Sequence, residues 1–181
     1  MFQEKRVLRY AGIGPRKTPS DQLEVMTHIA GQLSLSGWIL SSGWGEGADQ
    51  AFGIGAPVDK QIQWLPNTGK NYILEAPFRW ASMAPAMSQI ASQFHPYWNN
   101  MKPYTKALME RNVAILFGEQ FHQYVDIVIY WQSAEDDQSF TSGTNHTRRI
   151  ARAHEIPCFN IRIPDEQKAL CDFVAKMEAG L

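Results

Sequence analysis

A glycine-rich turn directly after an apolar segment is the feature of this sequence that most limits how the chain can fold. Residues 39–42 are typical of a strand end, and Gly43, Gly45 and Gly47 follow at alternate positions. An apolar pattern suited to a helix restarts at residues 51–52. A strand, a glycine-rich turn and a helix N-terminus in this order direct backbone N–H groups and the positive end of a helix dipole to one point. The pattern predicts a site for an anion, with phosphate as the expected ligand.

A second strand-and-glycine unit occurs near the N-terminus. Residues 7–11 form a short predicted strand, followed by Gly12, Ile13, Gly14 and Arg16 and then by a helix. Loops that leave the carboxyl ends of neighbouring parallel strands converge on one crevice. Two such loops with an arginine between them predict a pocket for phosphate and ribose. The alternative, that the glycines only permit tight connections, stays open at this point.

Composition and charge indicate one globular domain. The chain has 181 residues, of which 44% are hydrophobic and 19% charged, and we interpret residues 1–181 as a single domain. The net charge of −1 supplies no overall basic field for nucleic acid or anionic lipid, so such binding would need a local patch. The two cysteines fit neither a disulfide framework nor a metal spacing, and no signal peptide or membrane-spanning stretch is evident. We therefore expect a cytoplasmic protein with no membrane partner.

Strand and helix patterns alternate along the whole chain. Strands are predicted at residues 7–11, 38–42, 60–66, 125–131 and 158–163, and helices at about 18–36, from 51, at 104–118, at 145–154 and at the C-terminus. Residues 67–103 carry no strand pattern, and we interpret them as an elaboration beside the sheet, with a helical composition at 80–94. The alternation predicts an α/β three-layer sandwich with a mostly parallel central sheet.

Four motifs, taken together and in this order, resemble the SLOG superfamily. They are residues 10–16, residues 42–49, residues 110–118 and residues 142–144, the last directly before a predicted helix. The superfamily contains the DprA DNA-processing proteins and the LOG, or "lysine decarboxylase-like", phosphoribohydrolases. Small DprA-like proteins of bacteriophages are the most similar group, which would place this protein in a host cytoplasm. The resemblance covers about residues 7–163, and the motif order is specific for the fold and not for an activity.

The resemblance implies a modified Rossmann-like fold whose pocket binds a nucleotide or a nucleotide-derived, ADP-ribose-like ligand, or in DprA the backbone of single-stranded DNA. It implies three phosphate-facing loops, formed by Gly12, Gly14 and Arg16, by Gly43, Gly45 and Gly47, and by Ser142, Gly143 and Thr144. Arg111 stands where LOG enzymes keep a catalytic arginine on a helix. We add the loop neighbours Ile13, Ser42, Trp44, Glu46 and Asp49 to the candidate ligand-binding residues.

The chain departs from the LOG pattern at Thr147. LOG hydrolases carry a glutamate at this position, three residues after the threonine of the third loop, where it assists departure of the base from ribose. A threonine lacks the acidic group that an oxocarbenium-like centre requires. If the protein is an enzyme, the catalytic candidates are therefore Arg111, Glu46 and Asp49. A non-catalytic alternative has Asp49 hydrogen-bonded to its own turn and Glu46 contacting ligand hydroxyls.

Trp44 is a second departure, because the family usually has a small residue there. Its ring would either stack on a base, which contributes about 1–3 kcal/mol per base, or narrow the cleft. The sequence leaves both interpretations open. The five histidines show no metal-ligand spacing, so no metal and no cofactor are predicted.

Three functions follow as hypotheses. The first is a binding module for a nucleotide or nucleotide-derived small molecule. The second is a DprA-like accessory protein for single-stranded DNA, with a local basic rim formed by Lys5, Arg6, Arg9, Arg148, Arg149 and Arg152. The third is an N-glycosidic hydrolase of nucleoside monophosphates, of the phosphoribohydrolase type. The resemblance to LOG enzymes adds a homodimer as a further prediction.

Overall fold

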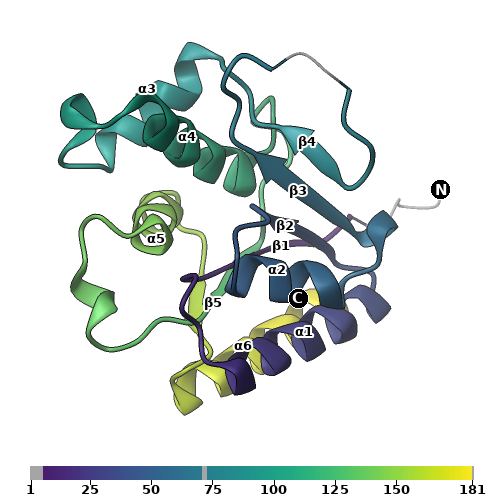
Figure 1. The fold of residues 1–181 in the computed structure, drawn as a ribbon. Helices are drawn as coiled ribbons and strands as arrows, with labels where there is room; N and C mark the ends of the chain where they lie inside the picture. Colours follow the sequence, from purple (N-terminus) through teal and green to yellow (C-terminus); the bar gives the residue numbers. More distant parts are fainter. Residues whose placement is uncertain (1–5, 71–72, 181) are drawn as a thin grey trace.

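The computed structural model describes residues 6–70 and 73–180 as an α/β protein (Figure 1). Within these residues, six strands form one sheet in the order β4-β3-β2-β1-β5-β6, and every adjacent pair is parallel. The strands are β1 (Arg9–Ile13), β2 (Ile39–Ser42), β3 (Gln61–Leu65), β4 (Phe78–Trp80), β5 (Ile127–Tyr130) and β6 (Cys158–Asn160). The predicted Rossmann-like sandwich with a parallel sheet is confirmed.

The strand order places a topological switch point between β1 and β5. The chain adds β2, β3 and β4 on one side of β1, and then returns to add β5 and β6 on the other side. Tyr10 lies opposite Ile127 in β5, while Arg9 lies opposite Ile39 in β2. In open parallel sheets, ligands bind outside the carboxyl ends of the strands at such a point. The loops after β1 and β5 are therefore the ones that the topology favours for binding.

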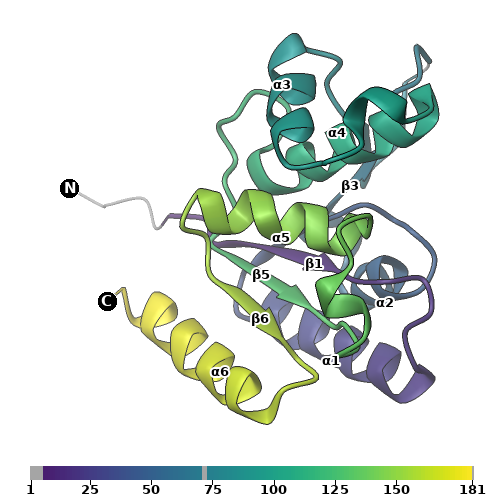
Figure 2. The same cartoon turned by 90° about the vertical axis from the view of Figure 1, so that its left-hand side faces the viewer.

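Helices cover both faces of the sheet. Figure 2 shows α3, α4 and α5 above the sheet and α1, α2 and α6 below it. The helices are α1 (Ser20–Leu35), α2 (Ala48–Gly55), α3 (Pro85–Gln93), α4 (Pro103–Phe117), α5 (Gly143–Ala153) and α6 (Pro164–Ala179). Short 3₁₀ turns lie at Val58–Lys60, Trp98–Asn100 and Asp136–Gln138. Within the described segments, no helix combines the length and the apolar character that a membrane crossing requires.

Each face of the sheet has its own hydrophobic core, and strand alternation divides the side chains between them. In β5, Ile127 and Ile129 pack with α1, α2 and α6, whereas Val128 and Tyr130 pack with α3, α4 and α5. Successive side chains of a strand point to opposite faces, so a run that is apolar at every position suits a strand covered on both sides. This run is the reason why β5 is recognisable in the sequence.

Strand β4 is absent from the sequence prediction. Its three residues, Phe78–Trp80, lie in the segment that we expected to be without a strand, and they pair with Gln63–Leu65 of β3. A strand this short at a sheet edge carries too few alternating positions for a recognisable pattern. The helix expected within residues 80–94 is present as α3. Helix α5 begins at Gly143 and not at Asn145, so the third loop motif forms its first turn.

Candidate functional site

A cavity of about 790 Å³ opens at the carboxyl ends of β1, β2, β3 and β5. Loops after these strands form part of its wall, and α4 and the start of α5 form the rest. Pockets for small molecules usually measure about 300–1,000 Å³. Its wall includes Ile13, Gly14, Pro15, Arg16, Lys17, Gly43, Trp44, Gly45, Glu46, Asp49, Leu65, Pro66, Tyr104, Leu108, Met109, Arg111, Asn112, Ile115, Gln132, Asp136, Ser142, Gly143, Thr144 and Thr147.

The first and second glycine loops are in direct backbone contact. The Ala48 amide donates to the Pro15 carbonyl at 3.4 Å. Gly47 has a φ of +87°, and a Cβ on it would lie 2.5 Å from the Arg16 carbonyl oxygen. Both the positive φ and the close approach require glycine here. The contact fixes the backbone of Arg16, whose exposed side chain borders the cavity together with Lys17.

A buried ion pair connects the second loop to helix α4. Arg111 Nη1 donates to the Gly43 carbonyl at 2.6 Å and lies 3.6 Å from Asp49 Oδ2. The Asp49 carboxylate also accepts a hydrogen bond from the Gly45 amide at 3.3 Å. Burial raises the pKa of Asp49, and the Arg111 guanidinium opposes this increase. A Cβ on Gly43 would collide with the Arg111 guanidinium, so glycine is needed for this approach.

Most of the backbone amides at the start of helix α2 have hydrogen-bond acceptors within the protein. Gly45 donates to Asp49, Ala48 donates to Pro15, and Gln50 donates to the Gly45 carbonyl at 3.1 Å. Asp49, in the first turn of α2, places its own carboxylate at the positive end of the helix dipole. This arrangement matches the alternative role given to Asp49, a hydrogen bond to its own turn.

The start of helix α5 contributes polar groups to the cavity. Ser142 caps the helix by accepting the Asn145 amide, while Gly143 and Thr144 occupy the first turn at the cavity wall. The first amides of a helix lack intrahelical acceptors, and they carry the positive end of its dipole. Thr147, one turn further on, donates its hydroxyl to the Gly143 carbonyl at 3.0 Å. The turn therefore presents amide and hydroxyl groups and no carboxylate.

Buried side chains behind the cavity hold α5 in place. Asn112 of α4 donates to the Gly143 carbonyl at 3.4 Å and lies 3.4 Å from His146 Nδ1. His146 Nε2 contacts the Ala91 carbonyl of α3 at 2.9 Å. Burial lowers the pKa of His146 to about 4, so the ring is neutral at pH 7. A neutral ring can donate to Ala91 and accept from Asn112 at the same time.

Gln132, in the loop that leaves β5, orders the acidic segment that follows it. Its Nε2 donates to the Asp136 carbonyl at 3.0 Å, and its Oε1 accepts from Arg148 at 3.2 Å. Asn145 of α5 donates to the Asp136 and Ser139 carbonyls at 2.9 and 2.8 Å. The acidic loop is thereby fastened to the start of α5, with Asp136 at the cavity wall.

Most of the candidate residues lie together. Those at the cavity wall are Ile13, Gly14, Arg16, Gly43, Trp44, Gly45, Glu46, Asp49, Arg111, Ser142, Gly143 and Thr144. The remaining three are Gly12, Ser42 and Gly47, which support the loops from outside the wall. Gly12 packs against Phe52, and the buried Ser42 hydroxyl donates to the Gly12 carbonyl at 2.6 Å. Their assignment as ligand-binding residues stays a prediction.

Other wall residues were not found by sequence reasoning, among them Lys17, Tyr104, Gln132 and Asp136. Gln132 carried a usable signal, because it follows the strongest strand at the carboxyl edge of the sheet. Lys17 adjoins Arg16 and continues the first loop. Tyr104 had no such signal, because its position depends on how the start of α4 packs beside the loops.

The basic rim expected for DNA binding is not assembled as predicted. Arg148 is buried, pairs with Asp137 and lies over the Tyr130 ring with its guanidinium carbon 4.5 Å from the centroid. Arg149 donates to the Phe94 carbonyl at 2.9 and 3.0 Å. Arg148 binds protein groups because buried guanidinium donors need partners, and the partly buried Arg149 is held by the Phe94 and Phe140 carbonyls. Arg152 is exposed, and Arg6 and Arg9 lie at the amino end of β1, away from the cavity. Lys5 lies outside the described residues.

The acidic candidates for catalysis differ in their surroundings. Asp49 is engaged by Arg111 and Gly45, whereas Glu46 is exposed at the wall. Thr147 occupies the wall position where the LOG pattern has glutamate. The catalytic roles of Arg111, Glu46 and Asp49 stay predictions. In the part of the chain that the structure describes, no three His, Cys, Asp or Glu side chains are grouped to hold a metal ion.

The fold and the cavity define a Rossmann-like α/β protein with a cavity at the switch point of its sheet. No protein-family model matches the chain, and no curated protein matches it. Among solved structures, it is similar to DNA processing protein A from Helicobacter pylori, a structure that concerns the binding of single-stranded DNA. The TM-score is 0.57 and the identity 18%, over 91% of this chain and 72% of that chain. The similarity shows a DprA-like fold; membership of the SLOG superfamily stays a prediction.

Proposed function

We propose that this protein binds a nucleotide or a nucleotide-derived, ADP-ribose-like ligand in the cavity at the switch point of its sheet. The observation that carries the proposal is the meeting of the first turn of α5 with Arg16 and Lys17 around one cavity of about 790 Å³. Helix amides and cationic side chains are the groups that bind phosphate in proteins. The ligand's phosphate would lie against Gly143 and Thr144, with Arg16 reaching it from the first loop.

The remaining wall suits the other parts of a nucleotide. Glu46 and Asp136 offer carboxylates that accept hydrogen bonds from ribose hydroxyls, and Trp44 and Tyr104 offer aromatic rings. The buried Asp49–Arg111 pair balances its own charge. The exposed cations at the wall are thus Arg16 and Lys17, a number suited to one or two phosphate groups.

Calorimetric titration with nucleoside monophosphates, dinucleotides and ADP-ribose tests the proposal. We expect at least one of these to bind, and Arg16→Ala to weaken its binding by about tenfold or more, because a charge-assisted contact to phosphate is lost. Arg152→Ala, an equal change at an exposed arginine outside the cavity wall, is the matched control and should leave the affinity unchanged. If none of the compounds binds, or if both variants bind like the parent protein, the proposal fails.

Single-stranded DNA is the second candidate ligand, and the structural similarity to the Helicobacter protein favours it. In this proposal, one nucleotide of the strand occupies the cavity and its neighbours continue past Arg16 and Lys17. Binding along a phosphate backbone needs several cations and weakens steeply with salt. Arg148 is buried and Arg149 is engaged by backbone carbonyls, which leaves fewer cations for such a path, so we rank it second.

Fluorescence anisotropy with a labelled oligothymidylate distinguishes the two candidates. Tight binding that weakens with added salt and is not displaced by mononucleotides would favour DNA. Absence of oligonucleotide binding, together with calorimetric binding of a small nucleotide, would exclude it.

A further inference from the structure

The backbone at Trp44 adopts a conformation that favours glycine. Its φ is +53°, in the left-handed region, where the Cβ of an ordinary residue approaches the backbone too closely. Glycines stand on both sides of it, at Gly43 and Gly45. A bulky aromatic residue is among the least suitable for such a position. The local backbone therefore does not explain the presence of tryptophan here.

Buried amide side chains hold this backbone in place. The Trp44 amide donates to Gln63 Oε1 at 3.1 Å, and Gln63 Nε2 donates to Gln61 Oε1 at 2.7 Å. Gln61 in turn donates to the carbonyls of Gly53 and Ala56 in and after helix α2, at 3.0 and 2.6 Å. Both glutamines are buried. Since each amide group has fixed partners at both ends, the chain of hydrogen bonds fixes the place from which the indole extends.

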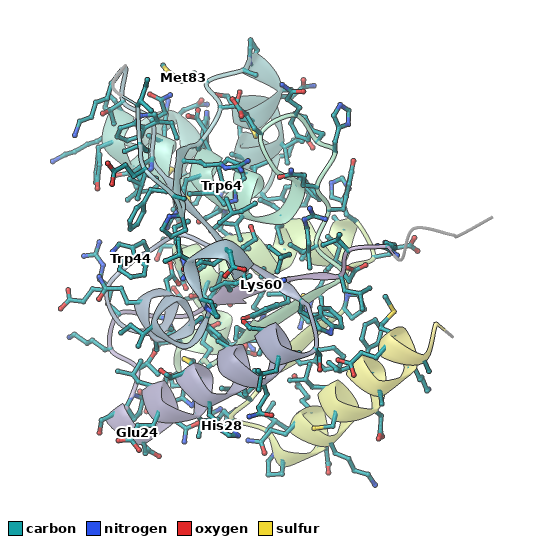
Figure 3. All side chains as sticks on the ribbon, turned by 90° about the vertical axis from the view of Figure 1, so that its right-hand side faces the viewer. Glu24, His28, Trp44, Lys60, Trp64 and Met83 are labelled. Carbon is teal, nitrogen blue, oxygen red and sulfur yellow. The ribbon has the colours of Figure 1, made fainter. Side chains whose placement is uncertain are left out.

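The indole ring packs against Phe78 and Gly53 and also borders the cavity. The Phe78 ring meets it in a T-shaped contact, with centroids 5.3 Å apart at 87°. A Cβ on Gly53 would lie 2.5 Å from the indole Cζ3 atom, so glycine leaves room for the ring beside α2 (Figure 3). The side chain is only half-buried, and the rest of it belongs to the cavity wall. Two elements, α2 and β4, are thus adapted to hold an aromatic surface at the cavity.

We infer that Trp44 is a specificity-determining residue that stacks on the base of the bound nucleotide. The inference rests on the proposed function, and adds that the ligand retains its base and that the base lies on the Trp44 side of the cavity. An unfavourable backbone conformation that is held by dedicated contacts is typical of residues that bind ligands. Stacking needs only an aromatic face, so it recognises purines and pyrimidines alike.

Calorimetry with AMP, CMP and ribose 5-phosphate tests this inference. We expect the parent protein to bind each nucleoside monophosphate about 10- to 100-fold more tightly than ribose 5-phosphate, which has the same sugar and phosphate and no base. Trp44→Leu should reduce this preference to within about threefold while the affinity for ribose 5-phosphate stays unchanged. Trp44→Phe should retain part of the preference, since it keeps a smaller aromatic ring. Trp98→Leu changes a tryptophan outside the cavity wall and should have no effect.

The outcomes separate the inference from the proposed function. If Trp44→Leu keeps the full preference for AMP and CMP, or lowers all three affinities equally, Trp44 serves packing or pocket shape and the inference is wrong. If the parent protein binds ribose 5-phosphate as tightly as AMP and CMP, the base contributes nothing to the affinity. The inference then fails and the proposed function stands. If it binds none of the three, the inference fails, and the proposed function fails as well unless a dinucleotide or ADP-ribose binds. Circular dichroism of each variant identifies any that is unfolded, and Trp44→Phe then provides the comparison.

Discussion

Asp49 and Arg111 lie 3.6 Å apart at the cavity wall and join the first turn of α2 to the middle of α4, on opposite faces of the sheet. The Asp49 carboxylate also accepts a hydrogen bond from the Gly45 amide, and Arg111 donates one to the Gly43 carbonyl. One buried pair therefore shapes the second glycine loop and connects the two layers of helices.

Removing one member of this pair should destabilise the fold strongly. We expect Asp49→Ala to lower the free energy of unfolding by about 3–5 kcal/mol, because it leaves the Arg111 charge buried without a partner. Asp49→Asn should cost less, since its amide oxygen can still accept from Gly45. The double variant Asp49→Ala with Arg111→Met should be more stable than Asp49→Ala alone. Urea unfolding of the parent protein, both Asp49 variants, Arg111→Met and the double variant measures this, and strictly additive losses from Asp49→Ala and Arg111→Met would contradict the coupling.

Gly47 is expected to be less tolerant of a side chain than another glycine with the same backbone conformation. Gly47→Ala meets both a positive φ of +87° and the Arg16 carbonyl, whereas Gly37, at +89°, has no atom within 4 Å of an added Cβ. Gly37→Ala should therefore cost about 1 kcal/mol for backbone strain alone, and Gly47→Ala clearly more. Thermal unfolding compares the two. Equal losses of stability in the two variants would mean that the close contact of Gly47 with Arg16 adds nothing to the cost of the substitution.

Stability should fall in mild acid because of His146. Its pKa is about 4 in the folded protein and 6.5 in the unfolded chain, so between these values the unfolded state binds more protons. The stabilisation is therefore complete above pH 6.5 and is lost as the pH falls towards 4, by about 3 kcal/mol at most. A proton on His146 Nδ1 would also point at the Asn112 Nδ2 group, which is itself a hydrogen-bond donor.

Urea unfolding between pH 7 and 4 measures this dependence. His146→Gln should flatten it, and His28→Gln, at an exposed histidine of α1, should not. An unchanged slope in His146→Gln would assign the acid sensitivity to other groups.

Glu155 gives an independent measure of what a left-handed side chain costs in this protein. It follows α5 with a φ of +57° and is exposed. Glu155→Gly should raise the free energy of unfolding by about 1 kcal/mol, because glycine adopts this helix-ending conformation without a Cβ clash. Glu119→Gly, also at an exposed glutamate but without a positive φ, should be neutral or slightly destabilising. A loss of stability in Glu155→Gly would contradict the assumption that the left-handed backbone at Trp44 is costly.

The fold was predictable to the extent that single segments carry a pattern. The apolar run of β5, the glycine loops after β1 and β2 and the apolar patterns at residues 60–66 and 158–163 are local features, and five of the six described strands were found from them. β4 was missed because Phe78–Trp80 forms a strand only by pairing with β3. The helical arginines show the same limit. A sequence places Arg148 and Arg149 on one helix, but not against Asp137 and Phe94.

By itself, the sequence determined the parallel α/β class and the gathering of the glycine loops at one edge, because hydrophobic periodicity and glycine positions act through neighbouring residues. The tertiary structure alone decided which polar groups remain available to a ligand. Asp49 and Arg111 form an ion pair across the sheet, and Asp49 occupies the start of α2 with its own carboxylate. The start of α5 lies at the cavity wall without such a carboxylate. The physical reason is that a buried polar group without a partner costs free energy, so most buried polar groups take one, and that partner often lies far along the chain.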